Sequence, residues 1–391
     1  MQPRILLLDC PIKPYAWGSK TALPHLLGTA PTGQPQAELW IGAHPDGPST
    51  LRIQGKTKNL EEAIAQAPEA WLSPWVARRF GKLPLLLKVL AAAEPLSIQA
   101  HPNKAQAEAG FAKEEAAGIP RTAPHRAYKD ANHKPELIVA HSKFRALCGF
   151  RPAPQIVGLL SPLELPELDD AISDLAAGGP LQPLYRTLMS LPAATKKSVA
   201  ERAVAAARGK SESAYREVVR LAERYPGDVG VLSPLLLNLL ELAPDDALFL
   251  DAGELHAYLE GTGIELMASS DNVLRGGLTP KHVDVPELLA TLHFRTGRPT
   301  ILRPEATADR RVRTYRTPVP DFALSVIDLD AGPYLSTADS IELLLSVGGA
   351  PYLEFGERHL LAPGQAAVVP AGAAYTLRGP GRLYRAFVPR T

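Results

Sequence analysis

The sequence predicts a mainly β protein that contains one α-helical insert. Short apolar segments separated by Gly, Pro and Asp turns occur up to residue 150 and return after Pro244. Between them, residues 160–240 contain long Ala-, Leu-, Glu- and Arg-rich segments with helical periodicity. The chain of 391 residues is also too long for one ordinary hydrophobic core, so two or three domains are expected.

The N-terminal part predicts loops, short strands and two capped helices. Residues 1–55 lack helical periodicity and predict irregular loops with brief strands. A helix is expected to begin at Asn59, and the apolar run Leu83–Ala92 is expected to be buried. A second helix is expected to begin after its cap at Asn103 and to end at Gly118.

The segment Leu96–Pro102, LSIQAHP, predicts a strand with two different faces. In an extended chain its apolar residues share one face, and Ser97, Gln99 and His101 share the other. A hydroxyl, an amide and an imidazole in one row indicate a face turned to water or to a binding site. The segment Glu136–His141, ELIVAH, is a second strand candidate.

Strands also dominate the C-terminal part. The candidates are ALFLDAG, IELMAS, TILRP, FALSVIDL, SIELLLSV, QAAVVPAG and LYRAFVP. Their lengths and turns fit an all-β sandwich or barrel. A weak internal repeat relates residues 249–261 to residues 368–379 and suggests two related β domains. In this repeat His256 corresponds to Tyr375, so only the first copy offers an imidazole.

Composition excludes several classes of function. The 42 basic and 41 acidic residues give a net charge of +1, which provides no electrostatic support for binding a nucleic acid or a membrane surface. No apolar run reaches the roughly 18 residues of a membrane-spanning helix, and the N-terminal apolar run is too short for a secretory signal. The two cysteines, Cys10 and Cys148, do not form a disulfide framework. We therefore expect a cytoplasmic protein, and we expect it to be a monomer.

Four residues on or beside predicted strands are candidate metal ligands: Gln99, His101, Glu136 and His256. Two imidazoles, one carboxylate and one amide oxygen suit Zn²⁺, with Mn²⁺, Co²⁺ or Fe²⁺ as alternatives. The absence of Cys from the set favours a catalytic over a structural metal site. The alternative interpretation is that each His is an ordinary hydrogen-bonded strand residue.

Charged residues accompany these candidates. Lys134 lies two residues before Glu136, hence on the same face of the predicted strand. Lys134 and Glu265 are competing candidates for a proton-transfer base, since a buried Lys beside a cation has a depressed pKa. Cationic and hydroxyl groups suit a phosphate, and the candidates of this kind are Ser97, Lys88, Arg275 and Lys281. The alternative is that the charged residues form ordinary salt bridges within turns.

Several blocks of this sequence resemble one family. They are PYAWG (14–18), AELWIGAHP (37–45), SIQAHPNK (97–104), YKDANHKPE (128–136), FLDAGELHAYLEG (249–261), IELMASSDNVLRGGLTPKHVDV (264–285) and the terminal β unit. Together they resemble the type I mannose-6-phosphate isomerases, in the same order and over nearly the whole length. The helical insert matches in position and character alone.

The resemblance implies a catalytic Zn²⁺ and interconversion of mannose 6-phosphate and fructose 6-phosphate through a cis-enediolate, in mannose activation towards GDP-mannose or in mannose breakdown. It assigns the metal ligands to Gln99, His101, Glu136 and His256. It assigns the catalytic arginine to Arg275, and acid–base or ring-opening roles to His133, Lys134, Glu265 and Asp271. It places Ser97, Lys88 and Lys281 at the phosphate, and Trp17 and Glu38 in the lining of the site.

The resemblance also implies two cupin-like, jelly-roll β domains and a helical subdomain. We predict that residues 1–150 and 242–320 form a discontinuous catalytic domain, with the helical subdomain at residues 151–241. Residues 321–391 are predicted to form the second cupin-like domain, without a metal site.

Three alternative functions deserve comparison. Two His and a carboxylate on a cupin also suit a non-haem iron dioxygenase, although an oxygenase has no general need for the cationic loop with Arg275 and Lys281. A non-catalytic sugar-phosphate binder would be expected to lose ligands or the arginine, and this chain retains them. An isomerase that also accepts glucose 6-phosphate or unphosphorylated sugars is the third alternative.

Overall fold

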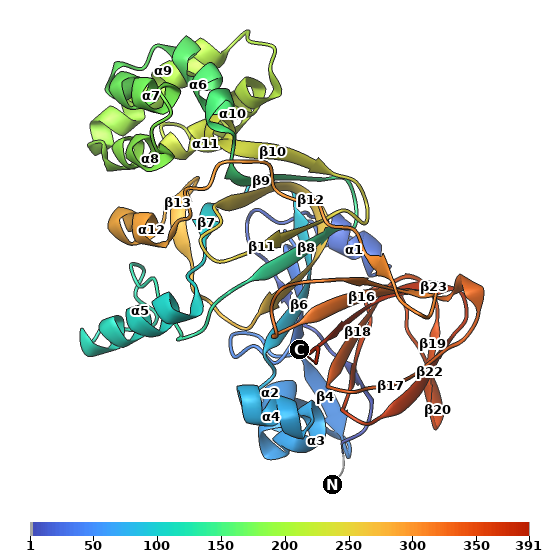
Figure 1. Ribbon diagram of the computed structural model, residues 1–391. Helices are drawn as coiled ribbons and strands as arrows, with labels where there is room; N and C mark the ends of the chain where they lie inside the picture. The colour runs from blue at the N-terminus through green and yellow to red at the C-terminus, as the bar shows by residue number, and fades with distance from the viewer. Residues whose placement is uncertain (1–2, 391) are drawn as a thin grey trace.

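The computed structural model describes residues 3–390 and divides into three regions (Figure 1). A ten-stranded sheet occupies the centre, helices gather at one end, and a seven-stranded and a four-stranded sheet lie at the other end. The sheet-rich architecture with one helical region confirms the coarse fold prediction.

The central sheet is organised around its longest strand. Its strands are β2 (Ile12–Lys13), β3 (Glu38–Gly42), β6 (Leu85–Ala92), β7 (Ile98–Ala100), β8 (Glu136–Ala140), β9 (Phe144–Phe150), β10 (Leu237–Leu242), β11 (Ala247–Leu250), β12 (His256–Ala268) and β13 (Leu274–Gly277). The first part of β12 pairs with β7 and β9, and its second part pairs with β6 and β8. One strand therefore connects two differently paired halves of the sheet.

Two strand predictions can be compared with their burial. All eight residues of β6 are buried, as predicted for the apolar run around it. In β7 the apolar Ile98 and Ala100 are fully buried, whereas Gln99 between them is half-buried, which confirms the alternation. The strand ends at Ala100, so His101 follows β7 rather than belonging to it.

The N-terminal part adds a hairpin and short helices to the central sheet. These elements are β4 (Thr50–Ile53), β5 (Lys56–Asn59), α1 (Ala22–Leu26), α2 (Leu60–Gln66), α3 (Pro68–Leu72), α4 (Pro74–Phe80), α5 (Lys104–Ala116) and, later in the chain, α12 (Val285–Thr291). Both predicted helix starts are confirmed. The Asn103 side chain and the Gln106 side chain form a complete capping box on α5, whereas the Asn59 side chain makes no capping hydrogen bond on α2.

The helical region packs directly on the central sheet. It consists of α6 (Ala153–Leu160), α7 (Asp169–Ala176), α8 (Leu181–Ser190), α9 (Ala193–Ala207), α10 (Ser213–Arg224), α11 (Ser233–Leu236) and the 3₁₀ turns η1 (Ser161–Leu163), η2 (Pro166–Leu168) and η3 (Val229–Leu232). Its hydrophobic core also contains Ile98 and Ala100 of β7 and Leu274 of β13. The apolar face of β7 is therefore covered by the insert, which leaves the polar face of the strand for another environment.

The C-terminal region contains two sheets. The first comprises β1 (Leu6–Leu8), β14 (Glu305–Ala306), β15 (Val312–Tyr315), β16 (Ala323–Asp328), β18 (Glu342–Gly349), β21 (Ala366–Val369) and β23 (Gly381–Phe387). The second comprises β17 (Tyr334–Thr337), β19 (Tyr352–Phe355), β20 (Glu357–Leu360) and β22 (Ala374–Arg378), with the turn η4 (Leu329–Ala331) nearby in sequence. One hydrophobic core cluster spans the central sheet and the C-terminal region, since it contains Leu87 of β6 and Leu266 of β12 as well as Leu343 of β18.

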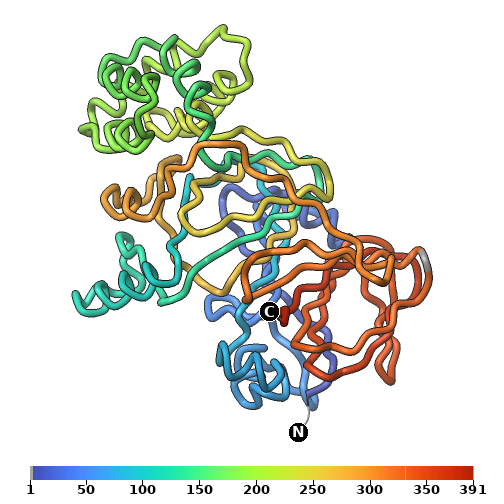
Figure 2. Tube along the Cα trace, viewed as in Figure 1, coloured from blue at the N-terminus to red at the C-terminus, as the bar shows by residue number. Residues whose placement is uncertain are grey.

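The two ends of the chain share a sheet (Figure 2). Leu6 of β1 pairs with Val368 of β21, and β14 and β15 continue the same sheet at its other edge. The predicted domain limits assigned these three strands to the first β domain. The predicted strand at TILRP is wrong, because only Leu302 forms an isolated bridge there; Pro304 has no N–H for a sheet, so a continued ladder is disfavoured.

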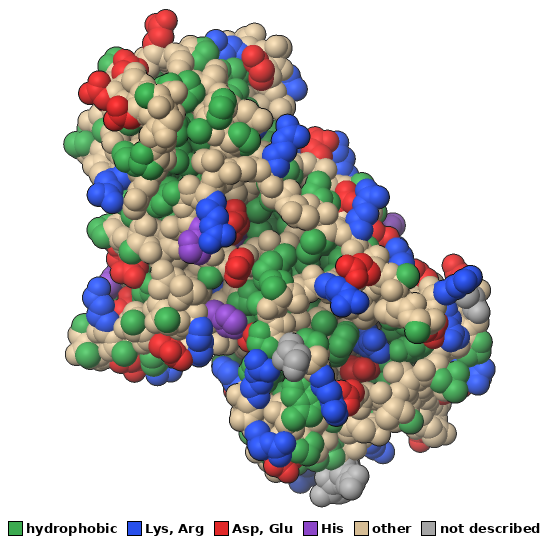
Figure 3. Space-filling view, in the orientation of Figure 1, with side chains coloured by type: hydrophobic (Ala, Val, Ile, Leu, Met, Phe, Trp, Pro, Cys, Tyr) green, Lys and Arg blue, Asp and Glu red, His purple; other side chains and the backbone are tan. Residues whose placement is uncertain are grey.

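Two further features concern the surface charge and the length of the helices. On the face shown in Figure 3, basic and acidic side chains are interspersed rather than separated into one-sign patches. Among residues 3–390, no helix combines the length and the apolar character that crossing a bilayer requires.

Candidate functional site

Three predicted ligands meet inside the central sheet. Donor atoms of His101, Glu136 and His256 all lie within 4.8 Å of one another, and each residue is about 1% exposed. His101 Nε2 lies 3.3 Å from Glu136 Oε1, and His256 Nε2 lies 3.5 Å from Glu136 Oε2. One carboxylate and two imidazoles, from segments up to 155 residues apart in the sequence, therefore lie together in the interior of the protein.

The strand register aligns further polar residues with this point. Gln99 of β7 lies directly opposite His256 on β12 and opposite Arg275 on β13. Directly opposed residues of antiparallel strands point to the same face, so the three side chains form one row. Gln99 Nε2 is 3.4 Å from His256 Nε2, and rotation of this amide about its Cγ–Cδ bond exchanges its nitrogen and oxygen.

Backbone carbonyls fix the tautomers of both imidazoles. His101 Nδ1 lies 2.7 Å from the carbonyl oxygen of Asn272, and His256 Nδ1 lies 2.9 Å from that of Glu254. A carbonyl can only accept, so each Nδ1 carries the proton and each Nε2 keeps its lone pair. Such carbonyl partners are typical of the histidines that bind metals.

The group fits a divalent metal ion. Burial lowers the pKa of His101 to about 4, with Glu136 opposing, so the ring is neutral near pH 7. Burial alone would raise the pKa of Glu136, but the Lys134 ammonium outweighs it and holds the pKa well below its ordinary value. Nε2 of His101 and Oε2 of Glu136 have no hydrogen-bond partner among residues 3–390. Buried lone pairs that face each other without a proton destabilise the folded state, and a cation bound between them removes this destabilisation.

A second cluster of His44, Asp46 and Asp271 does not fit a metal ion as well. The Asp46 N–H donates to His44 Nδ1 at 3.2 Å. The imidazole proton is then on Nε2, which lies 3.5 Å from Asp271 Oδ1. His44 therefore offers a proton, rather than a lone pair, to the carboxylate.

A cavity of about 550 Å³ lies beside the His–Glu–His group. The predicted site residues that line it are Trp17, Glu38, Lys88, Ser97, Gln99, Lys134, Glu136, Glu265, Asp271, Arg275 and Lys281. His101 and His256 are buried next to this lining. His133 is outside it, because its Nε2 lies 3.0 Å from both carboxylate oxygens of Asp321, which holds the ring away from the cavity.

Lys88 is paired with carboxylates. Its Nζ lies 2.9 Å from Glu265 Oε2 and 3.8 Å from Glu38 Oε1, and Trp40 Nε1 donates to Glu38 at 2.6 Å. Burial alone would lower the pKa of Lys88, but the two carboxylates outweigh it and raise the pKa. Burial raises the pKa of Glu265 despite Lys88, since one ammonium cannot fully compensate two carboxylates. This arrangement leaves Lys88 little capacity for the phosphate contact that we predicted.

Three other cations on the cavity are unpaired. Among residues 3–390, no carboxylate lies within ion-pair distance of Lys129, Arg275 or Lys281. Burial, together with Arg275 and Lys129, lowers the pKa of Lys281, and burial lowers that of Arg275. Uncompensated cations on one cavity favour a ligand that carries negative charge.

The structure adds residues that the sequence reasoning missed. Lys129, Tyr15, Tyr225 and Tyr258 also line the cavity. Tyr258 lies two residues after His256, on the same strand, and this spacing could have identified it. Tyr225 comes from the helical region, and its hydroxyl donates to the carbonyl of Pro95 at 2.8 Å.

Asn272 is the other missed residue, and it is fully buried. Its Oδ1 accepts from the backbone N–H groups of Lys129 and Asp130, and its Nδ2 donates to the carbonyls of Asp130 and Asn132. The same residue presents its own carbonyl to His101 Nδ1. Asn272 therefore connects the 129–132 segment to the His101 ring.

We expect Asn272→Asp to weaken metal binding. The substitution would place a carboxylate oxygen against two backbone carbonyls, which should disturb the carbonyl that orients His101. Losing such an orienting contact typically lowers metal affinity by about 10- to 100-fold. Competition with a chelator of known affinity measures the effect. Asn238→Asp is the matched control, since Asn238 is also buried and its Nδ2 donates to three carbonyls; equal losses of affinity in both variants would contradict the orienting role.

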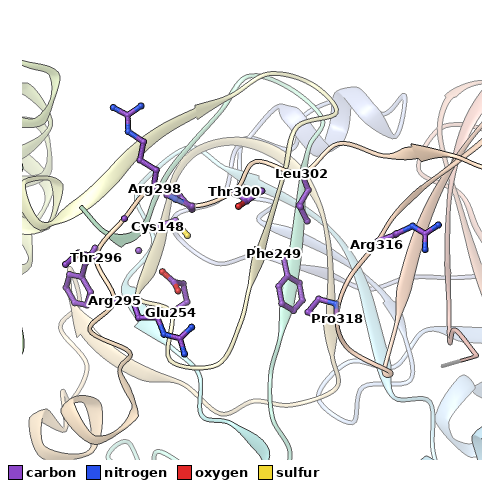
Figure 4. Close-up of a pocket in the computed structure, with 14 residues that line it drawn as sticks. Cys148, Phe249, Glu254, Arg295, Thr296, Arg298, Thr300, Leu302, Arg316 and Pro318 are labelled. Carbon is purple, nitrogen blue, oxygen red and sulfur yellow. The ribbon is translucent and has the colours of Figure 1, made fainter. Parts of the chain in front are cut away.

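A separate cavity of about 430 Å³ contains none of the predicted site residues. Figure 4 shows Glu254 and Arg295 beside one another in it, whereas Arg298 and Arg316 extend outward. The side chain of Glu254 faces this cavity while its backbone carbonyl holds His256. The candidate metal ligands thus lie beside the other cavity.

Comparison with known proteins gives consistent similarities. The catalytic-domain model of type I phosphomannose isomerases matches residues 5–153. The mannose-6-phosphate isomerase of Salmonella typhimurium is 42% identical over 383 residues, covering 96% of this chain and 97% of the relative. The human one is 37% identical over 389 residues, covering 89% and 88%.

The solved structures extend these similarities to the fold. A crystal structure of zinc-bound mannose 6-phosphate isomerase has a TM-score of 0.92 and 41% identity, covering 99% of this chain and 100% of the other. A structure of mannose 6-phosphate isomerase bound with zinc and yttrium has the same TM-score at 40% identity, with the same coverage.

Proposed function

Because the chain belongs to the type I phosphomannose isomerase family, we propose that it is a zinc-dependent enzyme that interconverts mannose 6-phosphate and fructose 6-phosphate. The observation that carries this proposal is the buried His101–Glu136–His256 group beside a cavity with unpaired cations. A coupled assay for fructose 6-phosphate formed from mannose 6-phosphate tests it. A pure, zinc-loaded protein that turns over neither sugar phosphate would refute the activity.

The residues proposed to hold the zinc are Gln99, His101, Glu136 and His256. Two neutral imidazoles, one carboxylate and one amide oxygen suit Zn²⁺ and leave the site with a net charge near +1. Gln99 adds a ligand without cancelling charge. When bound, the zinc supplies a Lewis acid for a sugar oxygen.

Side chains of the protein are proposed to carry out ring opening and proton transfer. Isomerisation opens the sugar ring and then moves a proton between neighbouring carbons through a cis-enediolate, whose negative charge lies on oxygen. Asp271, which lines the cavity and lies next to His44, is our candidate for ring opening. Glu265 is our candidate for the proton-transfer base, because burial raises its pKa towards the working pH, and Lys134 is the competitor.

Contacts in the structure lead us to revise two proposed roles. Lys88 is assigned to hold and charge-balance Glu265 rather than to bind the phosphate. His133 is assigned to Asp321 rather than to acid–base chemistry. The proposed phosphate contacts are Ser97, Lys129 and Lys281, with Trp17 and Glu38 in the lining.

Arg275→Ala should lower kcat by about 10²-fold with a modest change in KM. The guanidinium shares the strand face of Gln99 and His256, where it can stabilise the enediolate oxygen as charge develops. Loss of one such donor is worth roughly 3–4 kcal/mol. Steady-state kinetics on both sugar phosphates measure the effect, and Arg298→Ala in the separate cavity is the control. A rise in KM at unchanged kcat would instead assign Arg275 to the phosphate alone.

The finer structural predictions remain part of this proposal. We propose that both β regions are cupin-like jelly rolls and that the second has no metal site. In that second region the Tyr375 hydroxyl donates to the buried Glu342 at 2.7 Å, where a ligand would need a lone pair. Free Cys10 and Cys148 support a reducing compartment, and a cytoplasmic monomer acting in mannose activation or breakdown is our expectation. Light scattering of the purified protein tests the oligomeric state.

A further inference from the structure

The exit of the helical region lies against the loop that carries the unpaired cations. The segment Tyr225–Leu232 leads out of α10 through η3, and the loop Gly277–Lys281 follows β13. The two backbones approach closely: a Cβ added to Gly230 would lie 2.8 Å from the backbone nitrogen of Leu278 and 3.0 Å from Cα of Gly277. Only glycine allows this approach without a shift of one backbone.

Asp228 joins the two segments through both of its carboxylate oxygens. Oδ1 accepts from the Gly230 N–H at 2.7 Å, which closes the turn at the start of η3. Oδ2 accepts from the Thr279 N–H at 3.1 Å, across 51 residues of sequence. Hydrogen bonds to a charged acceptor are stronger than neutral ones, so this carboxylate is a firm attachment for the loop.

The loop needs such an attachment because its backbone is strained. Leu278 has a φ of 52°, a left-handed conformation that is unfavourable for a residue with a Cβ. The preceding Gly277 has a φ of 132°. The Leu278 side chain is 1% exposed and packs in the core of the helical region. Packing and the Asp228 bond together hold a turn that the loop would not favour by itself.

This turn determines where the cations lie. Arg275 precedes it on β13, and Lys281 follows it, with the Lys281 N–H donating to Thr279 Oγ1 at 3.1 Å. Leu278, Thr279 and Lys281 all line the cavity. A displacement of Thr279 would therefore move Lys281 relative to Arg275.

We propose that Asp228 is a positioning residue for substrate phosphate: it holds the 277–281 loop so that Lys281 reaches the phosphate, while Arg275 stays on the strand face of Gln99 and His256. The inference rests on the proposed isomerase function. It also gives the helical region a role in the site, since the same exit segment contributes Tyr225 to the cavity wall.

Asp228→Asn tests the attachment selectively. The amide oxygen can still accept from Gly230 N–H, but the amide nitrogen then faces Thr279 N–H, donor against donor. In the zinc-loaded enzyme we expect KM for mannose 6-phosphate to rise about tenfold, with kcat changed less than threefold and zinc content unchanged. Amide hydrogen exchange of a peptide covering 277–281 should become about tenfold faster. Asp228→Glu keeps a carboxylate at this position, so its KM should rise less than that of Asp228→Asn.

Asp309→Ala is the matched control. Asp309 Oδ1 also accepts from the N–H two residues ahead, that of Arg311, but it lies in the loop between β14 and β15, whose strands belong to the C-terminal sheet. In the Asp309→Ala variant, the KM for mannose 6-phosphate and the amide hydrogen exchange rate of the 277–281 peptide should both stay within twofold of the values for the unsubstituted enzyme.

The outcomes separate the inference from the proposed function. Unchanged exchange at 277–281 in Asp228→Asn overturns the attachment, and faster exchange with unchanged KM overturns the positioning role. Absence of turnover in the unsubstituted, zinc-loaded protein refutes the isomerase function and with it the role at a substrate phosphate, while the exchange result still decides whether Asp228 holds the loop.

Discussion

Exhaustive chelation of the purified protein should lower the isomerisation rate by about 10³-fold, and added Zn²⁺ should restore it. The expectation follows from the buried lone pairs of His101 and Glu136, which face each other without a proton between them. A Lewis acid contributes several kcal/mol to stabilising charge on a reacting oxygen, and each 1.4 kcal/mol is tenfold in rate. The coupled assay, combined with elemental analysis of zinc content, measures both quantities on the same sample.

Two variants make this test specific. Glu136→Gln keeps the shape of the side chain but removes the only carboxylate of the donor set, so zinc content should fall together with activity. Glu254→Gln is the control, because its side chain faces the separate cavity while its backbone carbonyl continues to accept from His256. Full activity after complete removal of zinc would contradict a catalytic metal.

Glu265→Gln should lower kcat by about 10³-fold, since a positioned general base typically contributes 10²- to 10⁴-fold. Burial raises the pKa of Glu265 above its ordinary value of 4.5, and only its ionised form can accept a proton. Therefore kcat/KM of the unsubstituted enzyme should fall as the pH decreases through a value above 4.5. In Glu265→Gln this acid limb should disappear from the pH–rate profile.

The competing base provides the comparison. Lys134 Nζ lies 3.1 Å from Glu136 Oε1, so Lys134→Met changes a cation beside the donor set while leaving Glu265 and Lys88 in place. This variant should retain the acid limb. If Lys134→Met removes the limb and Glu265→Gln keeps it, Lys134 is the base. The rate at which the transferred hydrogen exchanges with solvent, monitored by NMR, is an independent measure of proton transfer in both variants.

Local patterns in the sequence determined the elements around the site. Alternation in residues 96–102 is enough to place Gln99 and the apolar Ile98 on opposite faces of β7, because side chains alternate in any strand. The Asn103 capping box likewise defines the start of α5 through bonds within four residues. The candidate ligands could be named because metals select few side-chain types, and because the surrounding blocks resemble one family.

Only the tertiary structure decided how those side chains are used. The carbonyls of Asn272 and Glu254 select the tautomers of the two histidines, and no pattern marks a backbone carbonyl as a partner. The role of Lys88 likewise depends on the strand register that places Glu265 opposite it. Charge and residue type are properties of the sequence. Pairing depends on distances of a few ångströms between segments that are far apart in the chain, and only the folded sheet determines those distances.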